Sequence, residues 1–597
     1  MAIATAARKL AAGLTAGAWG GALVGLVEAS LISLTSAPEE LGLFPFAWLA
    51  YGGCGALLGL VVALLLVIVD RGGQRPIGPL AGALAMLPLG LAVARYHIIL
   101  RIFHEDLPPL SSVGLAVHLG IVMAGIVSAA LLYHLVKAVS LERHLLVSLS
   151  LFAAVAAATA GISRAAAARA SANAASILRE ADAESGANVI LIIADTLRAD
   201  SAARRMADRP EGGLARLARD GARFTQAHAQ STWTRPSVAT IVTSLYPSQH
   251  GAIQKMQPLS DDVTTVAEVF RDEGFWTAAF VSNINVAPIF NFQQGFGEYH
   301  YLAPSFYFGA SDSATRLAIY KGLRVARERL FRDRIHFENY YQDAKVLTKT
   351  VSDWLDQAPP SPFFLLIHFM DPHDPYFEIP YNGHGVARVN DPNPAAARAS
   401  ELRALYEENT DYFDDELSLL LNDLDRRGLY SSSVVALVSD HGEEFQEHGG
   451  WWHGSTLYEE ELRVPMLIKR ANESERGAVL DRQARLLDIA PTLVASAGLG
   501  IPNEFEGRDL WSPADQGPLF AEEELEGNTL YAVRVGNWKL ITANADNPRG
   551  LKAVELYDLE RDPSESRNLA AAMPEKVEDL ATQLDQFLDR AGTLDGE

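Results

Sequence analysis

Five apolar stretches fill the first 163 residues and constrain the fold of this chain more than any other feature. Polar residues separate them, and they run at about 10–35, 43–69, 76–100, 110–136 and 145–163. A helix needs about 20 apolar residues to cross the hydrocarbon core of a bilayer, and each stretch is near or above that length. The sequence therefore predicts a multi-pass membrane domain of five transmembrane helices over residues 1–163.

Lysines and arginines in the short loops predict the orientation of these helices. They precede the first stretch and follow the second and the fourth, as Arg8, Lys9, Arg71, Arg75, Lys137 and Arg143. The loop after the first stretch has acids as its only charged residues, and Arg101 in the third loop argues weakly for the opposite orientation. We therefore expect a protein of the cytoplasmic (inner) membrane, with its N-terminus inside and everything after residue 163 periplasmic or extracellular.

A few ionisable residues interrupt the apolar stretches, namely Glu28, Arg95, His97, His118 and His134. Such groups are costly within a membrane and are often functional. The sequence shows no pairing between them. The simpler interpretation is therefore that Arg95 and His97 reach towards a membrane surface and that the histidines face the helix bundle uncharged.

The residue pattern of the sequence changes after the last apolar stretch. Residues 164–187 are rich in alanine and predict a helical linker, with a flexible tether as the alternative. Beyond them, Val189–Ala194, Phe363–Phe369 and Val434–Val438 are short apolar runs typical of buried parallel strands, and helical patterns at 340–357 and 401–427 lie between them. This alternation predicts an α/β domain with a largely parallel sheet.

Charge and cysteine content exclude several classes of protein. The net charge is -23, and residues 1–165 contain 9 basic and 7 acidic residues, so the outer part alone carries -25. This acidity argues against a nucleic-acid partner. A site for anions would need local positive charge, from a metal or from residues such as Arg235 and Lys255. The single cysteine, Cys54, excludes an intramolecular disulfide framework and a cysteine-based zinc site.

Three motifs follow predicted strands directly, where ligands gather in parallel sheets. Asp195 offers a carboxylate to a hard cation, although an aspartate here also caps helices. Asp440 and His441 offer an oxygen and an imidazole to one metal, with a capped turn as the alternative. His368 and His373 belong to a proline-containing acidic loop that suits anion or metal binding better than packing.

A fourth motif, Thr232-Trp-Thr234-Arg235-Pro236-Ser237, places a hydroxyl before a proline. At a helix N-terminus the backbone N–H groups would favour an anion and lower the cost of an alkoxide on Thr234. Thr234 would also serve simply as the N-cap, with Pro236 in the first turn. The two interpretations are compatible.

Taken in order, these segments resemble the sulfatase branch of the alkaline-phosphatase superfamily over roughly 188–570. The resemblance implies a catalytic domain over 188–514 and a smaller α+β C-terminal subdomain over 515–597. Five membrane spans before such a domain also resemble lipoteichoic-acid synthases and phosphoethanolamine transferases. The segments that carry the resemblance are NVILIIADTLR, TRPSVATIVTSLYPSQHG, PFFLLIHFMDPHDPY, SDHGEEFQEHGGWWHG, RVPMLIKR, VRVGNWKLI and ELYDLERDPSESRNL.

The resemblance also implies roles for individual residues. Asp195, Asp440 and His441 would hold one divalent metal, whose identity among Ca, Mn, Mg and Zn stays open, with Thr234 as nucleophile on the same ion. Three histidines would contact the ester oxygens or protonate the leaving group: His368, His373 and His453. Asn283 stands where the family has a lysine-containing segment, and Arg235 and Asn283 would lie on the substrate side together with His373.

The chain departs from the family pattern at the nucleophile. Family sulfatases oxidise Cys or Ser to formylglycine at the position of Thr234, and threonine does not undergo that conversion. The family's arginine four residues later is Val238, and its second aspartate after Asp195 is Thr196. Cys54, the only cysteine, lies in a predicted span. The sequence therefore favours direct attack by Thr234 on a phosphate ester.

We expect a membrane-anchored, metal-dependent hydrolase of phosphate or sulfate esters that acts outside the cytoplasmic membrane, with envelope glycans or lipids as candidate substrates. A first alternative is a transferase of phosphoethanolamine or phosphoglycerol headgroups that uses the same threonine. A second alternative is a non-catalytic domain that binds an anionic glycan.

Overall fold

The computed structural model describes residues 2–35, 42–69, 77–98, 115–123, 125–127, 154, 157, 186–331, 336–471, 474–513 and 517–592. The chain forms two compact units. The first comprises Met1–Asn173 and Phe306–Phe331, and the second comprises Ala174–Ser305 and Arg332–Glu597.

The first unit contains the long apolar helices α1 (Ala2–Thr35), α2 (Leu43–Val69) and α3 (Ile77–Ile98). By length and composition, each contains a candidate membrane span. The first three predicted stretches are therefore helical. The fourth is described in part, as a shorter apolar helix over Leu115–Val127, and of the fifth only residues 154 and 157 are described.

Small residues bring α1 and α2 together. A side chain at Gly17 would collide with the backbone oxygen of Gly55, and one at Gly21 would collide with that of Tyr51. Close approach through glycines spaced four residues apart is the usual packing device of helices in membranes, where no hydrophobic force drives helices together.

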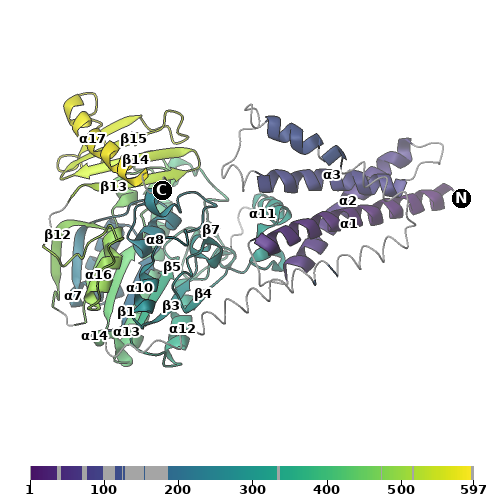
Figure 1. The fold of residues 1–597 in the computed structure, drawn as a ribbon. Helices are drawn as coiled ribbons and strands as arrows, with labels where there is room; N and C mark the ends of the chain where they lie inside the picture. The colour runs from purple at the N-terminus through teal and green to yellow at the C-terminus, as the bar shows by residue number, and fades with distance from the viewer. Residues whose placement is uncertain are drawn as a thin grey trace. The chain divides into compact units, whose positions relative to one another are not determined.

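A segment from far along the chain completes the first unit. Residues 306–331 form the 3₁₀ turns η4 (Tyr307–Gly309) and η5 (Ser313–Arg316) and the helix α11 (Ala318–Leu330). Figure 1 shows α11 in teal beside the purple helices of the chain's beginning. Tyr307, Leu317 and Tyr320 are buried in one apolar cluster with residues of α1 and α2.

The second unit is built on an eight-stranded sheet of order β12-β2-β11-β8-β1-β5-β3-β4. The strands β8, β1, β5, β3 and β4 run parallel, and β11 is antiparallel to both of its neighbours. The bounds are β1 (Val189–Ala194), β2 (Ala222–His228), β3 (Trp276–Val281), β4 (Glu298–Tyr301), β5 (Phe363–Phe369), β8 (Val434–Ser439), β11 (Met466–Lys469) and β12 (Ala478–Arg485).

Helices cover both faces of this sheet. Alternate residues of β1 enter two separate apolar clusters, because successive side chains of a strand point to opposite faces. One cluster includes residues of α8 (Thr234–Thr243), α10 (Val266–Asp272) and α16 (Ile489–Ser496). The other includes residues of α6 (Ala199–Asp208), α7 (Gly213–Asp220), α12 (Ala344–Leu355) and α13 (Ala399–Arg426). The predicted α/β fold is confirmed.

The C-terminal part forms a second, antiparallel sheet, coloured green to yellow in Figure 1. Its strands are β13 (Leu519–Leu525), β14 (Asn528–Val535), β15 (Trp538–Ala543) and β16 (Val554–Asp558). The helix α17 (Pro574–Ala591) packs on this sheet through Leu580, Leu584 and Phe587. The α+β C-terminal subdomain is therefore present.

Short elements fill the connections. The two small hairpins are β6 (Tyr376–Phe377) with β7 (Gly385–Val386), and β9 (Glu444–Phe445) with β10 (Trp451–Trp452). The short α-helices are α9 (Pro247–His250), α14 (Leu429–Ser432) and α15 (Glu459–Leu462). The 3₁₀ turns are η2 (Ile284–Val286), η3 (Pro288–Phe290), η6 (Phe337–Asn339), η7 (Ala396–Arg398) and η8 (Leu486–Asp488).

Candidate active site

Neighbouring parallel strands bring two aspartates together. Ala194 at the end of β1 pairs with Ser439 at the end of β8, so the next residues, Asp195 and Asp440, leave the sheet side by side. Both carboxylates are fully buried, and so is the imidazole of His441. The sheet therefore gathers at one edge the residues that the sequence suggested as metal ligands.

Three atoms of these residues face one another: Asp195 Oδ1, Asp440 Oδ2 and His441 Nε2. The imidazole Nε2 lies 3.7 Å from Asp195 Oδ1 and 3.5 Å from Asp440 Oδ2. All three atoms are buried and have no hydrogen-bond partner in the part of the chain that the structure describes. Two buried carboxylates that face each other without donors are costly, and a cation removes that cost.

The remaining atoms of these side chains are held in place. His441 Nδ1 lies 2.9 Å from the carbonyl oxygen of Gly442, to which it can only donate, so Nε2 carries the lone pair. Asp440 Oδ1 accepts from the backbone N–H of Thr196 at 3.2 Å and of His441 at 2.9 Å. The free atoms are thus fixed towards a common centre, with the spacing of ligands that lie about 2.0–2.2 Å from one divalent ion.

Thr234 is the first residue of α8 and is buried beside this centre. Its Oγ1 lies 3.5 Å from Asp195 Oδ2. Asn283, just beyond the end of β3, donates from Nδ2 to Asp195 Oδ2 at 2.6 Å and to Thr234 Oγ1 at 3.3 Å. The helix N-terminus, together with a cation held by the three candidate ligands, would stabilise negative charge on this hydroxyl.

Three further histidines surround the centre. His368 is the sixth residue of β5, and its Nε2 lies 3.8 Å from Asp195 Oδ2. The ring centroid of His453 lies 4.5 Å from that of His441 and 5.0 Å from that of His373. The structure therefore brings His368, His373 and His453, which were predicted from separate motifs, to one place.

The surroundings of these histidines set different protonation states. Burial lowers the pKa of His368 to about 4 and that of His453 well below its usual range, so both are neutral near pH 7. Burial would also lower the pKa of His373, but the nearby carboxylates of Asp195, Asp374 and Glu443 raise it to about 9. His373 is therefore the histidine suited to donate a proton.

Two family models match this chain. The model described as Sulfatase matches residues 187–499, which is more than half of the chain and includes Asp195, Thr234, Asp440 and His441. The chain belongs to the sulfatase family. A second model, described as N-sulphoglucosamine sulphohydrolase, C-terminal, matches residues 446–592 and so covers the C-terminal sheet and α17.

Individual relatives of this sulfatase-family protein are distant. Arylsulfatase K of Xenopus laevis is 29% identical over 206 residues, which are 32% of this chain and 37% of that protein. An arylsulfatase of Clostridium perfringens is 25% identical over 267 residues, which are 39% of this chain and 54% of that protein. The chain thus spans about a third to a half of the length of these relatives.

Solved structures agree on the fold. The phosphonate monoester hydrolase of Agrobacterium radiobacter superposes with a TM-score of 0.53 and 19% identity, over 68% of this chain and 96% of that protein. At this identity the likeness establishes the shared sulfatase-type architecture.

Arg235 follows Thr234 in sequence, but its side chain leaves the centre. Its guanidinium donates to the carbonyl oxygen of Gln254 at 2.8 Å and to Asn285 Oδ1 at 3.1 Å, and it stacks on the ring of Phe290. Asp371, an acid of the proline-containing loop with His373, accepts through one oxygen at 2.8 Å from the backbone N–H of Ala344, at the start of α12. In the structure both side chains serve local packing.

Two glutamates of this sulfatase-family site were missed by sequence reasoning. Glu443 Oε1 lies 3.0 Å from His453 Nδ1, and its Oε2 accepts from Tyr376 Oη at 2.6 Å. Glu523 on β13 accepts through Oε2 from Ser231 Oγ, Thr232 N and Thr232 Oγ1 at 2.8–2.9 Å. Glu443 lies in the segment SDHGEEFQEHGGWWHG, which the sequence already pointed to. Glu523 is almost 300 residues from its partners, and no motif around it in the sequence indicates its role.

We predict that Glu523→Ala destabilises the protein and slows catalysis. The substitution leaves the buried donors of Ser231 and Thr232 unpaired, which costs about 3 kcal/mol of unfolding free energy and loosens the segment that ends at Thr234. Glu523→Gln keeps an acceptor and serves as the matched control. Chemical denaturation and initial rates measure both effects, and equal stability of the alanine variant and the wild type would contradict the prediction.

The same glutamate predicts a pH dependence. Burial raises the pKa of Glu523 to about 7, so the folded protein holds a proton that the unfolded chain releases above its ordinary pKa of about 4.3. The free energy of unfolding of the wild type should therefore fall, relative to Glu523→Gln, as the pH rises from about 4.5 to 7. Parallel denaturation curves of the two proteins across this range test the sign.

Proposed function

We propose that this protein is a membrane-anchored, metal-dependent hydrolase of phosphate or sulfate esters that acts outside the cytoplasmic membrane. The observation that carries the proposal is the convergence of three buried, unpartnered ligand atoms next to the hydroxyl of Thr234. A domain that only binds a glycan has no need for such a centre, because the arrangement is costly without a cation.

Asp195, Asp440 and His441, with Thr234 Oγ1, would hold one divalent ion of a kind still to be identified. Bound there, such an ion lowers the pKa of the hydroxyl and neutralises charge on the transferred group. Thr234 Oγ1 gives up its proton to solvent and attacks the phosphorus or sulfur atom, the bond to the leaving oxygen breaks, and His373 gives that oxygen a proton. Water then hydrolyses the ester on Thr234 and regenerates the hydroxyl.

Threonine as the nucleophile separates this proposal from formylglycine chemistry. Cys54 is the only cysteine and belongs to α2, outside the segment matched as a sulfatase. Val238, at the position of the family's arginine, is buried in an apolar cluster. Asn283 supplies a neutral donor where the family has a lysine segment. These replacements support direct attack by Thr234 and favour phosphate esters over sulfate esters.

The candidate spans in α1, α2 and α3 support membrane anchoring, and the basic loops support a cytoplasmic N-terminus. We propose a membrane domain over residues 1–163, a linker over 164–187, a catalytic domain over 188–514 and a C-terminal subdomain over 515–597. Helices in the bilayer also favour a second candidate function, transfer of a phospho-headgroup from a lipid donor to an envelope glycan or lipid through the same threonine.

A substrate panel tests the proposal. The purified full chain is assayed in detergent with aryl phosphate, phosphodiester and sulfate esters and with Mn, Mg, Ca or Zn. Intact-mass and peptide analysis then searches for an adduct on Thr234. We expect metal-dependent hydrolysis and a phosphorylated threonine. A lipid headgroup that changes in cells when the gene is deleted would favour the transferase, and inactivity with every ester and metal would contradict both.

A further inference from the structure

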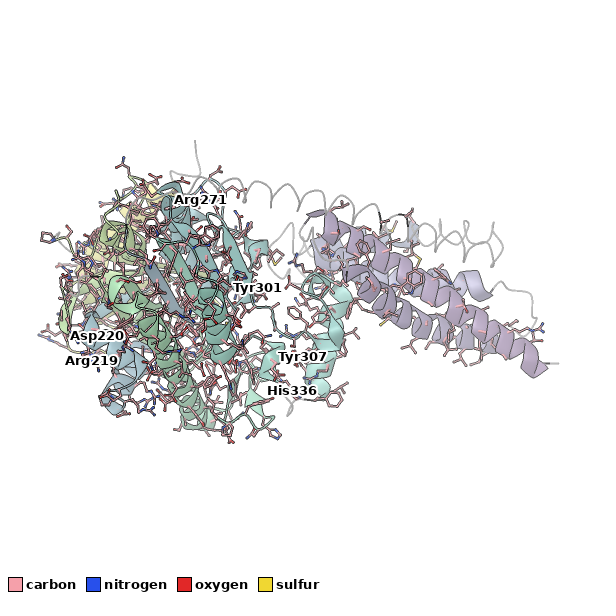
Figure 2. The ribbon with its side chains drawn as sticks, turned by 90° about the horizontal axis from the view of Figure 1, so that it is seen from below. Arg219, Asp220, Arg271, Tyr301, Tyr307 and His336 are labelled. Carbon is pink, nitrogen blue, oxygen red and sulfur yellow. The ribbon has the colours of Figure 1, made fainter. Side chains whose placement is uncertain are left out.

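The segment 306–331 interrupts the catalytic domain in sequence but belongs to the other unit in space. It lies inside the stretch matched as a sulfatase, yet it packs in one unit with α1, α2 and α3. Tyr307, Ala314, Leu317 and Tyr320 are buried there with apolar residues of α1 and α2. Tyr307, labelled in Figure 2, also lies 4.2 Å below the guanidinium of Arg327, which steadies the turn that precedes α11.

A buried carboxylate holds the beginning of α11. Glu28 lies in the candidate span of α1 and is fully buried. One of its oxygens accepts from the backbone N–H of Ala318 at 2.9 Å and lies 2.8 Å from His97 Nε2, and the other accepts from Tyr51 Oη. Tyr51 Oη in turn accepts from the backbone N–H of Ile319 at 3.2 Å.

These contacts satisfy groups that a helix cannot satisfy by itself. The first N–H groups of α11 have no carbonyl partner within the helix, and a negative charge at this end is favourable. Glu28 in turn needs partners, because a lone carboxylate is costly in a membrane span. Glu28 and Tyr51 of the membrane helices therefore supply acceptors for the first N–H groups of α11, and the N–H group of Ala318 supplies a donor for the buried carboxylate of Glu28.

The three side chains that receive α11 mark one end of the helices. Glu28 is in the C-terminal part of α1, Tyr51 in the N-terminal part of α2, and His97 next to the last residue of α3. In the sequence, Arg8 and Lys9 are near the start of α1, and Arg71 and Arg75 fall between the end of α2 and the start of α3. By the charge rule, α11 docks on the end that faces away from the cytoplasm.

The inserted segment also has the composition of a helix at a membrane surface. Phe308, Leu330 and Phe331 are large apolar residues with exposed fractions of 56, 77 and 53%. Lys321 is exposed as well, and its Nζ lies 5.5 Å from the ring centroid of Tyr96 on α3. Exposed apolar side chains next to basic ones are typical of helices that lie in the headgroup region.

We propose that residues 306–331 form a second membrane attachment of the catalytic domain. The domain is joined to the membrane helices once through the linker 164–187 and again through the docked α11, for which Glu28 is the positioning residue. The proposal rests on the membrane anchor proposed above and is independent of the chemistry at Thr234.

A cut in the linker tests this attachment. A site for a specific protease is inserted into residues 164–187 of the full chain, membranes are prepared, and the linker is cleaved. We expect the C-terminal fragment to stay in the membrane pellet after a high-salt wash. In Glu28→Ala most of the fragment should move to the supernatant, whereas Glu28→Gln, which keeps an acceptor for Ala318 N–H, should release less.

A second variant guards against misfolding of the membrane helices. Replacing residues 306–331 by a short Gly-Ser linker leaves α1, α2 and α3 unchanged and should release the fragment in the same way. Release of the wild-type fragment on cleavage would overturn the proposal, and so would retention in both variants. Absence of the uncleaved protein from the membrane fraction would contradict the proposed membrane anchor. The ester assay tests the role of Thr234 separately.

Discussion

Replacing Thr234 by alanine is expected to abolish metal-dependent ester hydrolysis. Thr234 is the proposed nucleophile, and its hydroxyl lies at the start of α8, 3.5 Å from the carboxylate of Asp195, a proposed metal ligand. Loss of a nucleophile lowers kcat/KM by roughly 10³–10⁶-fold in enzymes that form a covalent intermediate. Initial rates with the best ester of the substrate panel measure the effect.

Thr234→Ser is the matched control for this prediction. Serine keeps the oxygen and its bond from Asn283 and lacks only the methyl group, so we expect it to retain activity well above that of the alanine variant. Both variants should still bind metal, because three of the four proposed ligands, Asp195, Asp440 and His441, are unchanged. Full metal-dependent activity of the alanine variant would show that Thr234 is not the nucleophile.

The second large effect is expected at the metal ligands. Asp440→Asn removes the charge at Oδ2 but keeps an oxygen that can accept from Thr196 N–H and His441 N–H. We expect it to lower metal affinity by at least about 10–100-fold and to abolish activity at low metal concentration. Metal content of the purified protein and activity across a metal titration measure the two consequences.

The same substitution should have opposite effects on stability in the absence and in the presence of metal. Without metal, burial and the charge of Asp440 raise the pKa of Asp195 well above its usual range, so the two carboxylates destabilise each other. In chelator, Asp440→Asn should therefore raise the melting temperature, whereas with saturating metal the wild type should be the more stable protein. A variant that is less stable in both conditions would contradict a metal-holding role.

The core of this site could be predicted from the sequence because strand ends place it. The bounds expected for β1 and β5 are those observed, and β8 extends only one residue beyond its predicted end. Once three parallel strands are adjacent, the residues after them must meet at one edge. Asp195, Asp440 and His441 follow from this rule.

Side-chain direction and distant partners could not be predicted in the same way. Arg235 is next to Thr234 in sequence, but a helix turns successive side chains by about 100°, and its guanidinium ends on Phe290. Nothing local to Glu28 indicated that a helix 290 residues later would supply its donor. Hydrophobic periodicity indicates which face of a helix or strand is buried, but it does not indicate which other element packs against that face.

The strand β13 has a consequence for how the enzyme is made. Glu522, Glu523 and Glu524 of this strand each bind the segment that carries or follows Thr234, through Ser248, Thr232 and Gln254 respectively. These glutamates leave the ribosome more than 280 residues after Thr234. The segment around Thr234 can therefore gain these three contacts only when the last part of the chain has been synthesised. Until then, the candidate site of the nascent chain lacks the carboxylates that pair with the donors of this segment.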